Sequence, residues 1–325
     1  MRERYFEELE KEIKELVDPK SGLLKKDFSI LINCPLCGAK SSEHEELFLK
    51  NGYTFVRCQQ CEMIFVNPQV KTDLLTELYG ESRANNLWVK LQKSEKEKKW
   101  KKEYYLDCLA LINRYAGQNE LKLIDIGCST GYFLELASKY SQTYCLKGLE
   151  LNKIAIEESL AKGLNVEQKL LCDLDVKDLF DVFTMFGVLE HLPDPKTLLG
   201  DIKAHANNGA VVMAIVPNAY SLYHMFLQQN SVSFDGRNHL LYFSEKTLRK
   251  LFEDTGFNVL LIDTVLTGLD NIKRQIQWYN PYSRIHNNRY IPKTIKTFFD
   301  DNAAESLIYR YKLGLRLRII ASLNK

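Results

Sequence analysis

From residue 121 onward, short apolar runs alternate with helical segments, and this alternation constrains the fold more than any other feature of the chain. The runs are rich in Val, Ile, Leu and Phe and span 121–127, 144–151, 180–188, 210–217, 257–265 and 315–323. Helical patterns, such as 154–163 and 244–256, lie between most of them. Near-continuous apolar strands separated by helices indicate a mostly parallel sheet with helices on both faces. We therefore expect an α/β fold with a doubly wound, Rossmann-like sheet.

The first 120 residues have a different pattern. Apolar residues at helical spacing predict an amphipathic helix over 2–17, and 71–116 also has a helical pattern. Between them lies a short, turn-rich segment that carries cysteines. We expect an N-terminal module over 1–70, a helical linker or lid over 71–120, and a Rossmann-like domain over 121–325. This domain is expected to carry two insertions over one edge of its sheet, at 219–238 and 267–312.

Composition narrows the classes of partner. The chain has 325 residues, an apolar content of 45% and a formal net charge of +2, which demand neither a nucleic acid nor a membrane. Its longest apolar run, 210–217, is too short to span a bilayer, and its charged start does not resemble a signal peptide. We therefore expect a cytoplasmic protein, in which cysteines stay reduced.

Four cysteines form two C-x-x-C pairs, Cys34 with Cys37 and Cys58 with Cys61, and twenty residues separate the pairs. Four thiolates at this spacing suit tetrahedral, structural zinc in a zinc-ribbon module. A redox dithiol would need one pair, not two. We expect the other four cysteines to be non-ligands and place Cys128, Cys145 and Cys172 in core segments.

The segment 127–131, Gly-Cys-Ser-Thr-Gly, admits two interpretations. It fits the G-x-S-x-G turn that presents a nucleophilic serine, here Ser129. It also fits a glycine-rich turn that binds a cofactor. A hydrolase turn comes late in its sheet and needs an oxyanion loop upstream, whereas this turn follows the first recognisable strand. The cofactor-binding interpretation is therefore favoured.

Two acids indicate which cofactor is bound. Asp125 lies two residues before Gly127, and Glu150 ends the next strand, where a carboxylate can accept both ribose hydroxyls. An acid aimed into the turn disfavours the phosphates of a dinucleotide and favours an ammonium group. S-adenosylmethionine has an amine and a ribose but no phosphate, so we expect it to be the cofactor.

At this point the chain resembles the class I S-adenosylmethionine-dependent methyltransferases, over 121–266 and 313–325. The resemblance implies that Asp125, Gly127 and Gly131 line the methionine part, with Cys128 and Ser129 between them, that Glu150 contacts the ribose, and that Leu151 also lies at the cofactor. It further implies Asp173, or its rival Asp175, at the adenine amine, and Phe186 and Gly187 along the cofactor. Ser129 departs from the family pattern, which has glycine there.

The resemblance extends to bacterial sugar and secondary-metabolite methyltransferases that carry an N-terminal C-x-x-C module. It implies a sugar or nucleotide-linked sugar as acceptor, with O-methylation favoured, and Tyr79 closing over the cofactor or merely packing. His239 is the expected general base and His191 its main competitor. The alternatives are a zinc-ribbon binding protein on an inactive methyltransferase-like scaffold and an RNA methyltransferase. The acidic loop between the cysteine pairs disfavours nucleic acid.

Overall fold

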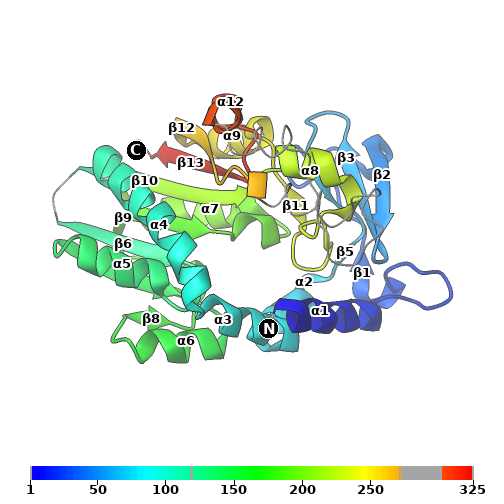
Figure 1. The fold of residues 1–325 in the computed structure, drawn as a ribbon, viewed down its shortest axis with the longest axis horizontal. Helices are drawn as coiled ribbons and strands as arrows, with labels where there is room; N and C mark the ends of the chain where they lie inside the picture. Colours follow the sequence, from blue (N-terminus) through cyan, green and yellow to red (C-terminus); the bar gives the residue numbers. More distant parts are fainter. Residues whose placement is uncertain (1, 118–119, 271, 273–301, 324–325) are drawn as a thin grey trace.

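A seven-stranded sheet lies at the centre of the computed structural model, which describes residues 2–117, 120–270, 272 and 302–323 (Figure 1). Its strand order is β12-β13-β10-β9-β6-β7-β8. The bounds are β6 (Leu121–Ile126), β7 (Tyr144–Leu149), β8 (Val166–Glu167), β9 (Phe180–Phe186), β10 (Ala206–Pro217), β12 (Asn258–Val265) and β13 (Arg316–Ser322). Strands β6 to β10 are parallel, whereas β13 runs antiparallel to both β10 and β12. The expected α/β class and mostly parallel sheet are confirmed.

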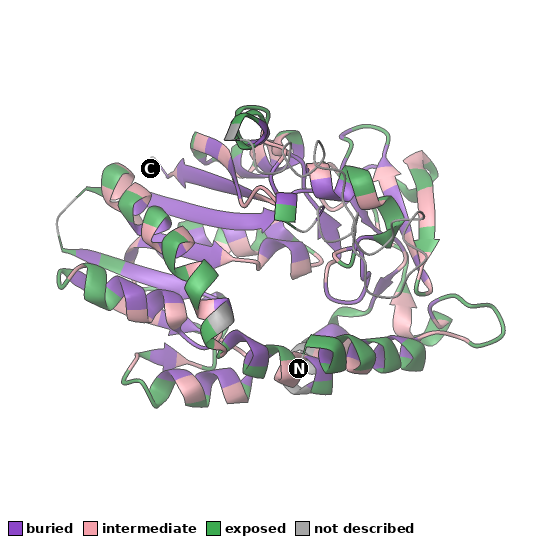
Figure 2. Ribbon diagram, in the orientation of Figure 1, coloured by how far each residue is buried: buried purple, intermediate pink, exposed green. Residues whose placement is uncertain are grey.

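Helices cover both faces of this sheet. Leu123 and Val211 pack with α4 (Glu95–Ala116), α5 (Tyr132–Tyr140) and α6 (Lys153–Leu160) on one face. Their chain neighbours Ile124 and Val212 pack with α7 (Pro195–Ala204) and α9 (Glu245–Asp254) on the other face. Successive side chains of a strand alternate between faces, which explains why the strand sequences are apolar throughout. Figure 2 shows these strands buried along most of their length.

The helical stretch before the sheet contains three helices. They are α2 (Thr72–Glu81), α3 (Arg83–Gln92) and α4, and α3 packs against the N-terminal helix α1 (Arg2–Leu16). Ser82 and Ser94 separate them, because each side chain accepts a hydrogen bond from the first turn of the following helix. Short 3-10 helices also occur: η1 (Lys26–Phe28), η2 (Ser41–Glu43), η3 (Leu171–Asp173), η4 (Leu189–His191) and η5 (Gln228–Asn230).

The cysteine-bearing segment folds into a second sheet, of order β11-β4-β3-β2. Its strands are β2 (His44–Lys50), β3 (Tyr53–Cys58), β4 (Ile64–Val66) and β11 (Leu241–Tyr242), while β1 (Ser29–Ile30) pairs with β5 (Gln69–Val70). Strand β11 comes from far downstream, and Leu241 pairs with Phe65. The buried residues of this sheet and of one face of the large sheet form one continuous core.

Residues 219–238, which contain α8 (Leu222–Leu227), pack in two places. Phe234 packs against Phe48 and Phe55 of the small sheet, and Leu222 packs against the cluster of Leu269, Ala304 and Ile308. One expectation needs correction. Cys145 and Cys172 are exposed rather than in the core, because Cys145 points out of β7 near the sheet edge and Cys172 lies in a surface turn. Strand β8 was not expected, since two residues are too few to form a pattern.

Of the second insertion, 267–312, residues 271 and 273–301 lie outside the described part of the chain. The described remainder includes α12 (Asn302–Arg310), which contacts β12. Among the described residues, no helix is long and apolar enough to cross a membrane.

Candidate active site

The turn after β6 has the left-handed backbone that glycine adopts most readily. The φ angles of Gly127, Ser129 and Gly131 are 70°, 50° and 70°. A methyl group built on Gly131 would lie 2.4 Å from Leu164 Cδ1 and 3.0 Å from Ser159 Oγ, so a side chain there would clash. Ser129 stands in a conformation that favours glycine, which accounts physically for the glycine that class I methyltransferases have at this position.

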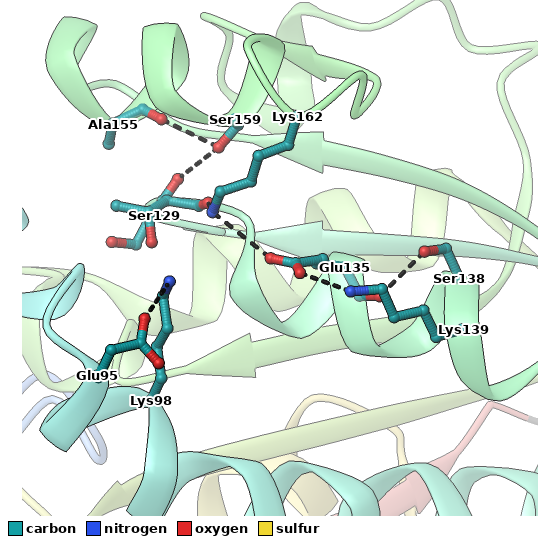
Figure 3. Close-up of polar contacts among 10 residues, drawn as sticks. Glu95, Lys98, Ser129, Glu135, Ser138, Lys139, Ala155, Ser159 and Lys162 are labelled. Carbon is teal, nitrogen blue, oxygen red and sulfur yellow. Dashed lines mark hydrogen bonds and ion pairs between the residues drawn. The ribbon is translucent and has the colours of Figure 1, made fainter.

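Ser129 acts through its backbone in this turn. Its N–H donates to Glu150 Oε2 at 2.8 Å, and its carbonyl accepts from Ser159 Oγ at 3.1 Å. Figure 3 shows Ser129 beside Ser159 and Lys162, and Lys162 pointing toward Glu135. No histidine of the described chain hydrogen-bonds the Ser129 hydroxyl. The arrangement lacks the serine–histidine contact that a nucleophile requires, which favours the cofactor-binding interpretation of the turn.

Glu150 joins the glycine turn to the end of β7. Besides the bond from Ser129, its Oε1 accepts hydrogen bonds from Leu151 N at 2.8 Å and Asn152 N at 2.9 Å. A carboxylate has roughly four acceptor positions, so these three bonds leave capacity for a ligand hydroxyl. The carboxylate is half-buried, fixed in place and located at the carboxyl end of a parallel strand. These properties fit the ribose of S-adenosylmethionine.

Asp125 is buried beneath the same turn, on the sheet face that α4 covers. Its Oδ1 accepts a hydrogen bond from Thr184 Oγ1 at 2.8 Å, and it is 2% exposed. Burial, and secondarily the charge of Glu150, raises the pKa of Asp125 to about 8. A cation placed beside it would stabilise the charged form, so the site suits an ammonium group. Thr184 was not foreseen, because only the pairing of β6 with β9 places it opposite Asp125.

The residues expected around the rest of the cofactor lie in different places. Phe186 ends β9 and packs against Phe133 and Tyr105, with ring centroids 4.6 and 5.0 Å apart, and Gly187 follows it. Asp173 is exposed in η3, against α7, and its Oδ2 accepts a hydrogen bond from Leu170 N. No contact among the described residues brings Asp173 to the glycine turn.

Two further expected residues add little to the site. Asp175, the rival of Asp173, is also exposed, and its Oδ1 accepts a hydrogen bond from Lys177 N. Tyr79 belongs to α2, but its side chain lies outside the described part of the structure.

A cavity of about 860 Å³ lies between α4 and α5, next to the glycine turn. Lysine and glutamate side chains from both helices line it, among them Lys98, Lys102 and Glu135. Figure 3 shows Lys98 paired with Glu95 and Lys139 paired with Glu135. The histidines described next do not line this cavity, so it is distinct from the site that they form.

His191 and His239 come together although 47 residues separate them in the sequence. Their ring centroids lie 4.9 Å apart. His191 lies in η4, directly after β9, and its Nδ1 donates to Asn238 O at 2.7 Å. His239 Nδ1 donates to Ser233 O at 2.9 Å and lies 3.5 Å from Asp235 Oδ2. The loop 233–239 therefore orients both imidazole rings.

Glu190 completes this cluster and was not singled out from the sequence. Ligand atoms of Glu190, His191 and His239 all lie within 4.8 Å of one another, so the three residues have a spacing that could hold a metal ion. Glu190 is 1% exposed, and its Oε2 has no hydrogen-bond partner among the described residues. Burial raises its pKa. The signal that could have identified it is a carboxylate next to His191 in the segment Val-Leu-Glu-His-Leu, directly after an apolar strand.

The loop 233–239 is anchored to the N-terminal helix. Arg237 is 1% exposed, and its Nη2 lies 2.7 Å from Glu12 Oε2 of α1, an ion pair without hydrogen-bond alignment. The guanidinium also donates to Asn238 Oδ1 at 2.8 Å, while Glu12 Oε1 accepts from Ala84 N. A buried ion pair therefore links α1 and α3 to the residue whose carbonyl orients His191.

The four paired cysteines converge. Cys34 Sγ lies 3.5 Å from Cys61 Sγ, Cys37 Sγ lies 3.5 Å from Cys58 Sγ, and all four sulfur atoms are within 4.8 Å of one another. These separations are too long for disulfides and compatible with four thiolates around one ion. The donor set therefore fits zinc.

Comparisons with known proteins give a family match and similar folds. A family model described as "Methyltransferase domain" matches residues 100–262. A solved structure of the plantazolicin methyltransferase BpumL, in complex with a pentazolic desmethylPZN analogue and SAH, is 13% identical; the match covers 78% of this chain and 95% of that chain, with a TM-score of 0.51. A SAM-dependent methyltransferase from Archaeoglobus fulgidus is 21% identical over 67% of this chain and 94% of that chain, with a TM-score of 0.44. No curated protein matches.

The family match covers the glycine turn, Glu150, and both histidines, and the sheet has the class I strand arrangement. The chain belongs to the methyltransferase-domain family and is a class I S-adenosylmethionine-dependent methyltransferase.

Proposed function

We propose that this enzyme methylates a hydroxyl group of a small polar acceptor, a sugar or a nucleotide-linked sugar. The observation that carries the proposal is the contact between His239 and His191, which follows the carboxyl end of β9 and hydrogen-bonds the backbone of Gly187. A hydroxyl is a weak nucleophile at neutral pH, so it needs a base that removes its proton as the new bond forms. A paired-histidine site next to the cofactor edge supplies one.

His239 is the proposed base. Its side chain is 22% exposed, so an acceptor can reach it, and Ser233 and Asp235 hold its Nδ1 side. The remaining nitrogen, Nε2, then accepts the proton. His191 is less suited, because burial of its ring and the neighbouring charge of His239 lower its pKa to about 3. A group that is so weakly basic takes few protons at neutral pH, so we assign His191 to support.

The proposed cofactor site uses the residues around the glycine turn. Bound S-adenosylmethionine supplies an electrophilic methyl group. In the proposed arrangement Asp125 faces the ammonium group and Glu150 the ribose hydroxyls. The remaining proposed contacts are those of Gly127, Cys128, Ser129, Gly131, Leu151, Phe186 and Gly187, with Asp173 toward the adenine and Tyr79 over the open side.

The proposal includes one structural zinc ion, held by Cys34, Cys37, Cys58 and Cys61. The convergence of their sulfur atoms supports it. We further propose the division into an N-terminal module (1–70), a helical lid (71–120) and a methyltransferase domain (121–325), with the module forming one side of the acceptor site. The pairing of Leu241 with Phe65, two residues after His239, supports this role.

The test combines an acceptor panel with two variants. The purified enzyme is incubated with methyl-labelled S-adenosylmethionine and with nucleotide-linked sugars, free sugars, small amines and RNA. Once an acceptor is found, we expect His239→Ala to lose at least about a hundredfold in turnover and to keep its affinity for S-adenosylhomocysteine. His191→Ala is the matched comparison. A loss of less than about fivefold in His239→Ala would remove the base assignment, and methylation of RNA alone would remove the acceptor class.

A further inference from the structure

Arg316 places a positive charge at the cofactor edge of the sheet, the edge where the parallel strands end and the proposed cofactor site lies. It is the first residue of β13, which runs antiparallel to β10, so this residue pairs with Pro217 at the carboxyl end of β10. A methyl group built on Gly187 would lie 3.7 Å from Arg316 Nη1 and 3.2 Å from Glu190 Oε1. The guanidinium therefore reaches across to the end of β9, where the histidine cluster begins.

The next arginine on the same strand face shows what a structural arginine looks like here. Arg318 donates from Nε to Asp263 Oδ1 at 2.9 Å and forms a second ion pair with Asp107 of α4. Two carboxylates thus neutralise it. Arg316 has no hydrogen bond or ion pair from its guanidinium to any residue that the structure describes, although Glu190 lies nearby. Within the described residues its charge therefore has a neighbouring carboxylate, Glu190, but no direct ion pair.

A second cation, Lys101, lies one helical turn before Tyr104 and Tyr105 of α4, whose ring centroids are 6.3 and 5.0 Å from that of Phe186 at the end of β9. Lys101 of α4 contacts Gln92 Oε1, and burial together with the charge of Arg316 lowers its pKa to about 8, against the opposite effect of Glu97. The charge of Arg316 also acts on Tyr104 and Tyr105 of α4. Two like charges near each other repel, and an anion bound between them would relieve the repulsion that Glu97 and Glu190 leave uncompensated.

We propose that Arg316 and Lys101 form a subsite for an oxyanion, the phosphate or carboxylate of a ligand bound at the cofactor edge. A guanidinium with a fixed backbone is suited to bidentate contact with such groups, and an ammonium group adds a point charge. Thr264 Oγ1 donates to the Arg316 carbonyl at 2.8 Å and fixes that backbone. The anion has two sources: the acceptor, which for a nucleotide-linked sugar carries a diphosphate, or the carboxylate of the cofactor's methionine. The first source rests on the proposed function; the subsite itself does not.

Calorimetric titration of the full-length enzyme separates the sources. Inorganic pyrophosphate is titrated into enzyme saturated with S-adenosylhomocysteine, and S-adenosylhomocysteine is titrated separately into the free enzyme. Arg316→Met and Lys101→Met are compared with Lys102→Met, an exposed neighbour that lines the cavity between α4 and α5. Circular dichroism confirms that each variant is folded.

Weakening of pyrophosphate binding by about tenfold or more in both site variants, with Lys102→Met unchanged, assigns the subsite to the acceptor. A similar loss for S-adenosylhomocysteine alone assigns it to the cofactor carboxylate. Unchanged affinities for both probes in Arg316→Met overturn the subsite, and so does a pyrophosphate site that only Lys102→Met weakens. Because wild-type binding of S-adenosylhomocysteine is measured independently, failure of the subsite is distinguishable from failure of the proposed cofactor site.

Discussion

Replacing Gly131 by alanine tests whether the geometry of the glycine turn is set by close packing. Gly163 offers a matched control, because its φ of 75° is close to the 70° of Gly131 and an added methyl group there would meet no atom within 4 Å. Alanine in the left-handed region costs about 1–2 kcal/mol, and the smaller entropy of the unfolded alanine chain returns about 0.4–1 kcal/mol. Gly163→Ala should therefore lower the free energy of unfolding by about 0–1.6 kcal/mol.

Gly131→Ala adds a steric cost to the same backbone strain. Its methyl group would lie 2.4 Å from Leu164 Cδ1, which can rotate away, and 3.3 Å from Ser159 Cβ, which is buried and cannot. Forced overpacking typically costs about 1–3 kcal/mol, so together with the net backbone strain the total is about 1–4.6 kcal/mol. The turn must also shift, and we expect affinity for S-adenosylhomocysteine to fall by about tenfold or more because the bond from Ser129 N to Glu150 is displaced.

Equilibrium unfolding in urea, followed by circular dichroism, measures the two free energies, and calorimetry measures the two affinities. The informative quantity is the difference between the variants, since both share the left-handed strain. A difference below about 0.5 kcal/mol, within ordinary surface effects, together with equal affinities, would refute the argument that close approach of Leu164 and Ser159 requires glycine at this position.

Four further outcomes are expected. Metal-replete protein should contain one zinc per chain by elemental analysis, and Cys58→Ser should lose it and be less stable; less than about a tenth of an equivalent in the wild type would contradict the site. Because burial raises the pKa of Asp125 to about 8, the free enzyme holds a proton there at pH 7, and the ammonium group of bound S-adenosylhomocysteine should displace close to one proton. Calorimetry in buffers of different ionisation enthalpy measures this release. Asp125→Asn should release none, and wild-type binding without release would count against the assignment. Glu12→Ala should lower the free energy of unfolding by about 3–5 kcal/mol, because it leaves Arg237 buried and unpaired; a loss under about 1 kcal/mol would show that the pair is not structural. Burial lowers the pKa of His224 to about 4. Between pH 6.5 and 4 the unfolded chain therefore binds a proton more readily than the folded chain, so the contribution of His224 to stability is complete above pH 6.5 and is lost as the pH falls toward 4. His224→Gln should flatten the fall in unfolding free energy over that range, and an unchanged slope would refute this.

The large elements were predictable because their signals are local. Strand β9 and helix α9 appear as an apolar run and an amphipathic repeat, and both were expected at nearly their observed bounds. The two-residue strands β8 and β11 have no such signal and exist only through their partners. For the same reason the cysteine pairs were recognisable from their spacing, whereas the pairing of their sheet with β11 was not foreseen.

The candidate site was predictable where its residues follow a strand directly. Glu150 and His191 occupy such positions, and strand order brings them to one edge. Arg316 was overlooked because its position depends on β13, which lies between β10 and β12 and runs antiparallel to both. The first residue of β13, rather than its last, therefore lies at the proposed cofactor site. The contact between His191 and His239 depends on a loop conformation that involves Asp235 and Ser233, and sequence alone does not determine it.

The pairing of β4 with β11 has a consequence for synthesis of the chain. A ribosome releases the β2–β3–β4 hairpins early, but the strand that completes their sheet is made only after most of the large sheet has followed. Until Leu241 and Tyr242 emerge, the nascent chain exposes the backbone of Ile64 and Phe65 as an open strand edge. Exposed edges pair readily with other chains. The period of greatest aggregation risk therefore falls during translation, and a slow or truncated translation product is more exposed to it than the finished enzyme.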